Sequence, residues 1–345
     1  SFNGGRFTSA AGLYVGAGSN FTVDNTGLLT VSAGMGTAPI TVEGGTLEFK
    51  GRLGNDTFTG GALTLGSGSS TLRATLFGGT TAGTGAVSIT LDSLSRGTSY
   101  STLVYGGTVM PGGGKAGIPG TWNQVNSGSN AEIRFSTPLT TGVSGIAGFV
   151  GPWAVTFDGG NWPSWTAYLP TTDPTTGVIG VGTVGLNFNG NFPYGNFTAD
   201  LSNSTATTHT NDAGRMGIGT RSTGTLRLQD GGTNHFNGRT NLLTVESGGI
   251  LTTNGSGGLN LRGGMIRPGT ASTSYYFPAF NGRTFSMGAL LLDGDAGSTA
   301  LVKYGTGVMS LRGYPAWWTN VTTSGSEVIP TSAGNGATGL VTGQL

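Results

Sequence analysis

Short triplets in which apolar and polar residues alternate, separated by glycine-rich turns, constrain this chain more than any other sequence feature. Alternation with a period of two is typical of half-buried β-strands. Gly, Asn and Asp residues follow the triplets at intervals of about seven to eleven positions and supply turns. The first triplets are Leu13-Tyr14-Val15, Phe21-Thr22-Val23, Leu29-Thr30-Val31, Ile40-Thr41-Val42 and Leu47-Glu48-Phe49. The pattern predicts an all-β chain of short strands that turn and continue.

Composition favours strands over helices and still provides a core. Glycine accounts for 68 of the 345 residues, and Ser plus Thr for 84. Because glycine costs about 1 kcal/mol per helical position relative to alanine, long helices are disfavoured. The hydrophobic fraction is nevertheless 35%, which distinguishes this chain from a disordered glycine-rich polymer.

Internal repetition points to a solenoid. The string Phe-Asn-Gly-Arg-Thr occurs at 236–240 and again at 280–284, and Phe2-Asn3-Gly4-Gly5-Arg6 is a near copy. A spacing of 44 residues fits two solenoid coils of about 22 residues. We therefore expect a right-handed parallel β-helix (β-solenoid) with a loop-rich insertion. An antiparallel β-sandwich is the alternative, because it also produces many short strands.

The rhythm of the triplets divides the chain into three parts. Residues 1–110 and 213–345 carry the triplets and are expected to form β-solenoid coils. Residues 111–212 are expected to form an irregular elaboration, rich in tryptophan and proline, that packs against the coils. The prolines that interrupt strand pairing there are Pro111, Pro138, Pro152, Pro163, Pro170 and Pro174.

One segment resembles a known repeat. Residues 301–313 fill every fixed position of the pattern Leu-x-Lys-x-Gly-x-Gly-x-x-x-Leu-x-Gly, which is typical of the autotransporter-associated β-strand repeat. Weaker echoes are Gly44-Gly45-Thr46-Leu47, Leu63-Thr64-Leu65-Gly66 and Gly248-Gly249-Ile250-Leu251. Residues 146–162 resemble a Gly-Gly-Trp-Ala element found in bacterial surface proteins with these repeats, although Pro152 and Asn161 replace its usual Gly and Asp.

The resemblance implies a parallel β-helix, export through the bacterial cell envelope, and a role in adhesion or surface layers. The family has no catalytic residues to transfer. We accordingly expect an extracellular or cell-surface structural subunit, not an enzyme, that assembles with copies of itself into a filament, sheath or surface layer. The chain begins at Ser1 without a signal peptide, as expected of a processed protein or a part of a larger one.

Charge and composition limit the partners. The chain has 16 Lys and Arg against 15 Asp and Glu, scattered singly, so it offers no basic face to nucleic acid. It contains no apolar run of about 18 residues, so we expect no membrane insertion. It also lacks cysteine, which removes disulfides and thiolate metal sites. No cofactor is predicted.

The large aromatic residues are candidates for contacts with partners. Buried tryptophans seal a core, whereas exposed ones pack against neighbouring subunits or stack on sugar rings. A carbohydrate-binding adhesin, with surface glycans as partners, is therefore the second functional hypothesis. The candidate interface or glycan contacts are Trp153, Trp162, Trp165, Trp317 and Trp318.

A third hypothesis is a polysaccharide-degrading β-helix enzyme. Asp293 and Asp295 flank a glycine, and stacked coils would place them beside Arg262 and Arg267. Two such carboxylates suit calcium binding or acid and base catalysis, although a surface turn gives the same sequence. His209 and His235 are the only candidates for a neutral-pH base. Both lie in polar stretches, and His235 is expected to be a turn residue.

Overall fold

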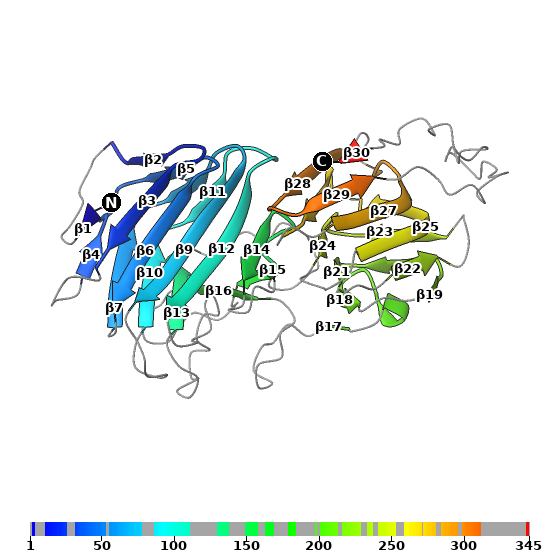
Figure 1. The fold of residues 1–345 in the computed structure, drawn as a ribbon, viewed down its shortest axis with the longest axis horizontal. Helices are drawn as coiled ribbons and strands as arrows, with labels where there is room; N and C mark the ends of the chain where they lie inside the picture. The colour runs from blue at the N-terminus through cyan, green and yellow to red at the C-terminus, as the bar shows by residue number, and fades with distance from the viewer. Residues whose placement is uncertain are drawn as a thin grey trace. The chain divides into compact units, whose positions relative to one another are not determined.

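The computed structural model describes the chain as an all-β protein whose sheets are mostly parallel (Figure 1). The described part contains no α-helix and one 3-10 turn, η1 (Leu201–Asn203). The chain divides into two compact units: unit 1 comprises Ser1–Thr141 and Gly148–Phe192, and unit 2 comprises Gly142–Ala147 and Pro193–Leu345. The described residues are 2–3, 11–25, 32–52, 55–77, 86–110, 130–137, 149–157, 163–168, 179–183, 197–198, 201–212, 216–228, 233–236, 241–252, 259–270, 272–280, 284–295, 299–311 and 343–344.

Unit 1 distributes its strands over three parallel sheets in rotation. Sheet A contains β1 (Phe2–Asn3), β3 (Asn20–Asp24), β6 (Thr46–Arg52), β9 (Ser69–Phe77), β12 (Thr102–Met110) and β14 (Ala154–Phe157). Sheet B contains β4 (Ser32–Gly34), β7 (Asn55–Gly60), β10 (Ala86–Leu91) and β13 (Asn130–Phe135). Sheet C contains β2 (Leu13–Val15), β5 (Ile40–Val42), β8 (Leu63–Leu65) and β11 (Leu94–Arg96). From β2 to β13, every third strand therefore returns to the same sheet.

The register of sheet C shows how regular this rotation is. Leu13 pairs with Ile40, Ile40 pairs with Leu63, and Leu63 pairs with Leu94. Equivalent residues therefore stack, although the length of chain between them changes from one strand to the next. This parallel pairing excludes the antiparallel sandwich for these sheets.

The predicted apolar positions form the interior of unit 1. Leu47 of sheet A pairs with Leu72, and Phe58 of sheet B pairs with Ile89; all four are buried. The rings of Phe49 and Phe58 lie 5.2 Å apart between their centroids, so sheets A and B share one core. Burial of each such side chain stabilises the fold by about 1.5–3 kcal/mol.

Antiparallel strands join two of these sheets. β15 (Pro163–Tyr168) lies antiparallel to β14, and β16 (Ile179–Thr183) lies antiparallel to both β15 and β13. Hydrogen bonding through β15 and β16 thereby joins sheets A and B into one continuous 12-stranded sheet. Strand pairing thus continues beyond residue 110 into the segment in which we expected loops.

Unit 2 repeats the parallel pattern with different strand lengths. One sheet contains β17 (Phe197–Thr198), β18 (His209–Asp212), β21 (Thr225–Leu228) and β24 (Ile250–Thr252). A second contains β19 (Met216–Ile218), β20 (Arg221–Thr223), β22 (Thr233–Phe236), β23 (Leu242–Val245), β25 (Leu259–Pro268), β27 (Thr284–Leu291), β29 (Val308–Leu311) and β30 (Gly343–Gln344). A third contains β26 (Ser274–Pro278) and β28 (Ala300–Tyr304). Only β30 pairs antiparallel among these strands.

Strand β25 is long because it pairs with two shorter strands of the second sheet, one after the other. Its first half pairs with β22 and its second half with β23. The register against β27 shifts between Arg262 and Met265, and Gly264 between them has a φ of 62°. Glycine accepts this left-handed conformation without steric cost, so the strand bends there.

The repeated Phe-Asn-Gly-Arg-Thr string does not mark coils of the expected length. Arg221 pairs with Leu243, which is the expected 22 residues away, but His209 pairs with Thr225 and Ser274 with Ala300, so the separation of paired residues in unit 2 is both shorter and longer than the string predicts. Phe236 is the last residue of β22, whereas Phe280 follows the end of β26, so the first residue of the string has a different position in the two copies. The rest of the first copy (237–240) and residues 281–283 of the second lie outside the described residues.

Candidate functional site

Two of the five candidate tryptophans are buried in the core of unit 1. The side chains of Trp153 and Trp165 are only 7% and 2% exposed. The ring of Trp165 meets that of Phe149 edge-on, with centroids 5.9 Å apart, and the guanidinium of Arg96 lies 4.8 Å above the ring of Trp153. In this structure both rings act as packing groups. Trp162, Trp317 and Trp318 lie outside the described residues, and their role as interface or glycan contacts stays a prediction.

Local sequence explains why Trp153 is buried. Gly151 has a φ of 148°, a conformation that favours glycine, and a side chain there would collide with the indole of Trp153. The carbonyl of Trp153 accepts a hydrogen bond of 2.8 Å from the amide of Leu103 in β12. The backbone therefore anchors Trp153, which directly precedes β14, beside β12 of sheet A.

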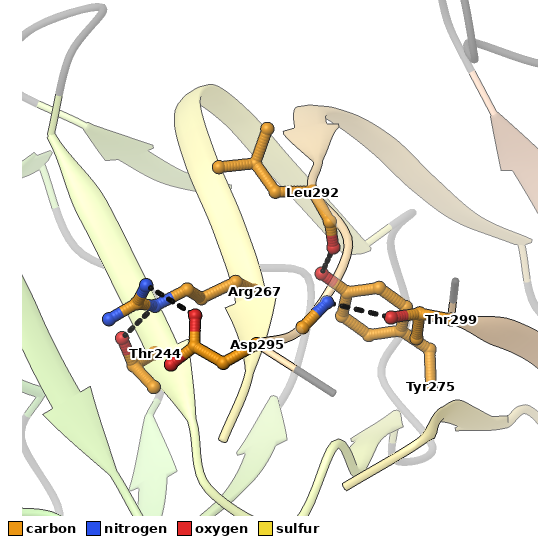
Figure 2. A network of polar contacts seen from close by, with 7 residues as sticks. Thr244, Arg267, Tyr275, Leu292, Asp295 and Thr299 are labelled. Atoms are coloured by element: carbon orange, nitrogen blue, oxygen red, sulfur yellow. Dashed lines mark hydrogen bonds and ion pairs between the residues drawn. The ribbon is translucent and has the colours of Figure 1, made fainter. Parts of the chain in front are cut away.

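The predicted pairing of Asp295 with Arg267 is present (Figure 2). Arg267 Nη1 lies 3.4 Å from Asp295 Oδ1, and Arg267 Nε donates a hydrogen bond of 3.3 Å to Thr244 Oγ1. These residues come from β25, β23 and the turn after β27, which the parallel register brings together. Arg262 lies in the first half of β25, before the bend, and its side chain is outside the described part.

Asp293 stabilises a turn. Its Oδ1 accepts a hydrogen bond of 2.8 Å from the amide of Thr299, while Thr299 Oγ1 accepts one of 2.8 Å from the amide of Gly294. The phenol of Tyr275 lies 2.7 Å from the carbonyl oxygen of Leu292 (Figure 2) and 2.7 Å from that of Ile266. The two aspartates thus differ: Asp293 closes the turn and Asp295 pairs with Arg267.

A third carboxyl group, Glu246, belongs to this cluster and was not predicted from the sequence. Partial burial raises the pKa of Glu246, Arg267 lowers it, and Asp295 raises it further. Glu246 directly follows β23. Gly269, which directly follows the neighbouring strand β25, has no side chain and so leaves room for that of Glu246. The cluster therefore combines one cation, one exposed carboxylate and one carboxyl that holds its proton more strongly than usual.

The two histidines lie in strands. His209 is buried in β18, and its Nδ1 lies 2.9 Å from Thr225 Oγ1 in the neighbouring β21. His235 lies in β22, paired with Met216 and Arg262, so the expectation of a turn residue was wrong. The Thr-rich and Asn-rich surroundings suggested turns, but parallel pairing on both sides made them strands.

A second polar network lies on the outward face of sheet C. Tyr14 Oη donates a hydrogen bond of 2.6 Å to Glu43 Oε2, and Ser67 Oγ donates one of 2.5 Å to Glu43 Oε1. These hydrogen bonds lower the pKa of the Glu43 carboxyl, and the bond to Glu43 raises the pKa of the Tyr14 phenol. Sequence reasoning used Tyr14 only as the polar member of a strand triplet.

The described ranges hold no group of three or more His, Cys, Asp or Glu side chains arranged to bind a metal ion. Within the same ranges no helix is long and apolar enough to cross a membrane. Comparison of the chain with protein-family models, curated proteins and solved structures gives no significant match. Its function must therefore be argued from its own residues.

Proposed function

We propose that this chain is an extracellular structural subunit, built as a right-handed parallel β-solenoid, that self-assembles into a filament, sheath or surface layer. The observation that carries the proposal is the rotation of the strands of unit 1 through three parallel, in-register sheets. A chain that returns to the neighbouring strand after visiting two other sheets winds around a shared interior. Crossover connections between parallel strands are almost always right-handed, which supports the handedness.

The interior supports a structural role. Equivalent apolar residues stack from one strand to the next, as Val42 does on Leu65. Buried hydroxyl groups provide hydrogen-bond partners for backbone groups at the turns. Ser70 Oγ donates to the carbonyl of Val42 and accepts from the amide of Gly44. Ser101 Oγ does the same for Leu65 and Thr98. Such stacks extend by adding strands, without a thicker core.

The polar groups that first suggested catalysis have structural partners. Asp293 bonds a backbone amide, Asp295 pairs with Arg267, and His209 bonds Thr225. A catalytic acid or base needs a pKa matched to its task and access to substrate. Glu246 has a raised pKa, but its cluster is accounted for by packing around Arg267. These contacts favour a scaffold over the polysaccharide-degrading enzyme.

Self-association follows from the parallel sheets. Strands at the end of a sheet carry backbone groups that pair with strands of another chain unless they are covered. The resemblance of residues 301–313 to repeats of bacterial surface proteins agrees with an extracellular location.

Electron microscopy and sedimentation velocity across a dilution series test this proposal. We expect regular filaments or sheets at high protein concentration and a concentration-dependent increase in sedimentation coefficient. Aligned material should give a diffraction spacing of about 4.8 Å, the distance between neighbouring strands. A single monomeric species at all concentrations would contradict self-assembly.

A further inference from the structure

Tyr14 presents a fixed aromatic ring on the surface. Tyr14 and Tyr100 are the large hydrophobic side chains that are exposed in the described ranges, by 64% and 57%. The phenol of Tyr14 is hydrogen-bonded to Glu43, and a Cβ on Gly16 would lie 3.2 Å from Tyr14 Cε1. The ring therefore rests beside the bare backbone of Gly16 and is held at its tip. Binding a ligand to a ring that is already positioned costs little conformational entropy.

The same face carries a row of hydroxyl groups. Tyr14 pairs with Thr41, Thr41 with Thr64, and Thr64 with Ser95, one residue from each strand of sheet C. Neighbouring strands lie about 4.8 Å apart, so the row has a regular spacing. Thr64 Oγ1 and Ser95 Oγ are 3.1 Å apart, which shows that adjacent members of the row contact each other.

The carboxylate beside the ring is also fixed in place. A Cβ on Gly66 would lie 2.7 Å from Glu43 Cβ, so the side chain of Glu43 lies over this glycine. Hydrogen bonds from Ser67 and Tyr14 lower the pKa of the Glu43 carboxyl, which is therefore ionised at neutral pH. The backbone of Ser67 also hydrogen-bonds this carboxylate, and of its roughly four acceptor positions one is left for a hydrogen bond from a ligand.

The charges of this face select the class of ligand. The strands of sheet C contain one cation, Arg96, whose Nη2 and Nε donate to the carbonyls of Ser99 and Ser101 and whose guanidinium covers Trp153. An anionic polymer therefore meets the Glu43 carboxylate, while Arg96 is already engaged. A neutral ligand rich in hydroxyl groups donates to that carboxylate instead, in charge-assisted hydrogen bonds.

We propose that the outward face of sheet C binds a neutral polysaccharide. One sugar ring stacks on Tyr14, one of its hydroxyls donates to Glu43, and the chain continues along Thr41 and Thr64. This site differs from the tryptophans that first suggested glycan binding. The proposal goes beyond the structural role, since it requires only that sheet C is folded.

Isothermal titration of the dilute protein with cellohexaose, chitohexaose and mannohexaose tests this site, with a heparin hexasaccharide as the anionic probe. We expect binding of at least one neutral hexasaccharide and no binding of heparin. Tyr14→Ala should weaken binding about tenfold, as expected for the loss of a stacked ring. Tyr14→Phe retains the ring and should weaken binding less, and Glu43→Gln tests the carboxylate. Tyr100→Ala removes the other exposed tyrosine and should bind like the unaltered protein.

Three results would overturn the proposal. They are binding of none of the neutral probes, binding of heparin alone, or equal affinity of Tyr14→Ala and the unaltered protein. Circular dichroism and thermal melting of each variant separate loss of the site from loss of the fold. If Tyr14→Ala changes the sedimentation coefficient and no sugar binds, the face is a contact between copies instead. Because titration is done on dilute protein, its result does not depend on self-assembly.

Discussion

The two units contain the same short sequence but give its glutamate opposite electrostatic surroundings. Thr41-Val42 ends β5 in unit 1 and Thr244-Val245 ends β23 in unit 2, and the next residue is Glu43 or Glu246. In both, the glutamate amide donates a hydrogen bond of 2.8 Å to the last carbonyl of the neighbouring earlier strand, that of Val15 in β2 or Thr223 in β20. In both, a glycine directly after the neighbouring later strand, Gly66 after β8 or Gly269 after β25, leaves room for the glutamate side chain.

The difference lies in the partners of the carboxyl group. Glu43 accepts hydrogen bonds from Tyr14 and Ser67, which favour its ionised form. Glu246 is partly buried and close to Asp295, and these effects outweigh the favourable charge of Arg267. The shared backbone geometry thus sets the position of the glutamate, and neighbouring strands set its chemistry. Parallel sheets can therefore keep one backbone geometry while the chemistry of their surface differs from unit to unit.

The largest difference is expected at the glycine of the turn. Gly44 and Gly248 both have positive φ, of 68° and 72°. A Cβ on Gly248 would overlap the carbonyl oxygen of Ser274, whereas the nearest atom to a Cβ on Gly44 is Ala17 Cβ at 3.4 Å. We expect Gly248→Ala to lower the free energy of unfolding by about 3 kcal/mol and Gly44→Ala by about 1 kcal/mol. Urea denaturation measures both, and equal losses would show that the two turns are not packed as described.

A smaller difference is expected at two buried tyrosines. Tyr105 in unit 1 and Tyr275 in unit 2 are 1% and 3% exposed, and burial raises the pKa of both phenols. Tyr275 Oη has backbone carbonyl partners, whereas Tyr105 Oη has no hydrogen-bond partner in the described structure. Tyr275→Phe should therefore lower the free energy of unfolding by about 1–2 kcal/mol.

Tyr105→Phe is the matched control, because it removes a buried hydroxyl that makes no hydrogen bond in the described structure. It should leave the free energy of unfolding unchanged or raise it by about 1 kcal/mol. The same urea titration measures both variants. A destabilisation by Tyr105→Phe as large as that by Tyr275→Phe would mean that the Tyr105 hydroxyl has a partner.

The smallest expected effect is a pH dependence of opposite sign. The raised pKa of Glu246 means that the folded state binds this proton more strongly than the unfolded state. Its contribution to stability is therefore greatest in acid and is lost as pH rises from the ordinary value of 4.5 through the raised pKa. Glu246→Gln should remove this loss and raise the melting temperature at neutral pH relative to the unaltered protein.

Glu43 should show the reverse behaviour. Its lowered pKa gives a stabilising contribution that is present above the ordinary value of 4.5 and is lost as pH falls through the lowered pKa. Glu43→Gln should remove that contribution at neutral pH and flatten the acid limb of a melting-temperature profile. Profiles with the same sign for both variants would refute the contrast between the two units.

The strands were predictable from the sequence because their side chains alternate. Ile40-Thr41-Val42 and Leu63-Thr64-Leu65 are strands with the predicted burial, and Thr41 and Thr64 lie between buried neighbours. Their pairing was harder to predict, because the turns vary in length and the separation between paired residues changes from strand to strand. A fixed coil length therefore misdescribed the stacking.

The site residues show what a single sequence leaves out. The expectation that the two aspartates lie beside arginines of the neighbouring strand is met by Asp295 and Arg267, whereas Asp293 bonds the amide of Thr299. Glu43 and Glu246 were missed, because an isolated acid before a glycine turn gives no motif. The available signal was the shared Thr-Val-Glu shortly before Gly-Gly, which marks equivalent turns in both units.

In-register stacking of the strands is the central claim, and engineered disulfides test it directly because the chain contains no cysteine. Thr41 pairs with Thr64 on adjacent strands of sheet C, whereas Ser95 lies one strand further. Adjacent strands are about 4.8 Å apart, within the Cα separation that a disulfide spans, and strands two apart are about 9.6 Å apart, which is too far. The account predicts that mild oxidation of dilute protein closes the pair Thr41→Cys with Thr64→Cys and leaves Thr41→Cys with Ser95→Cys reduced. Closure of the second pair, or failure of the first, would contradict it.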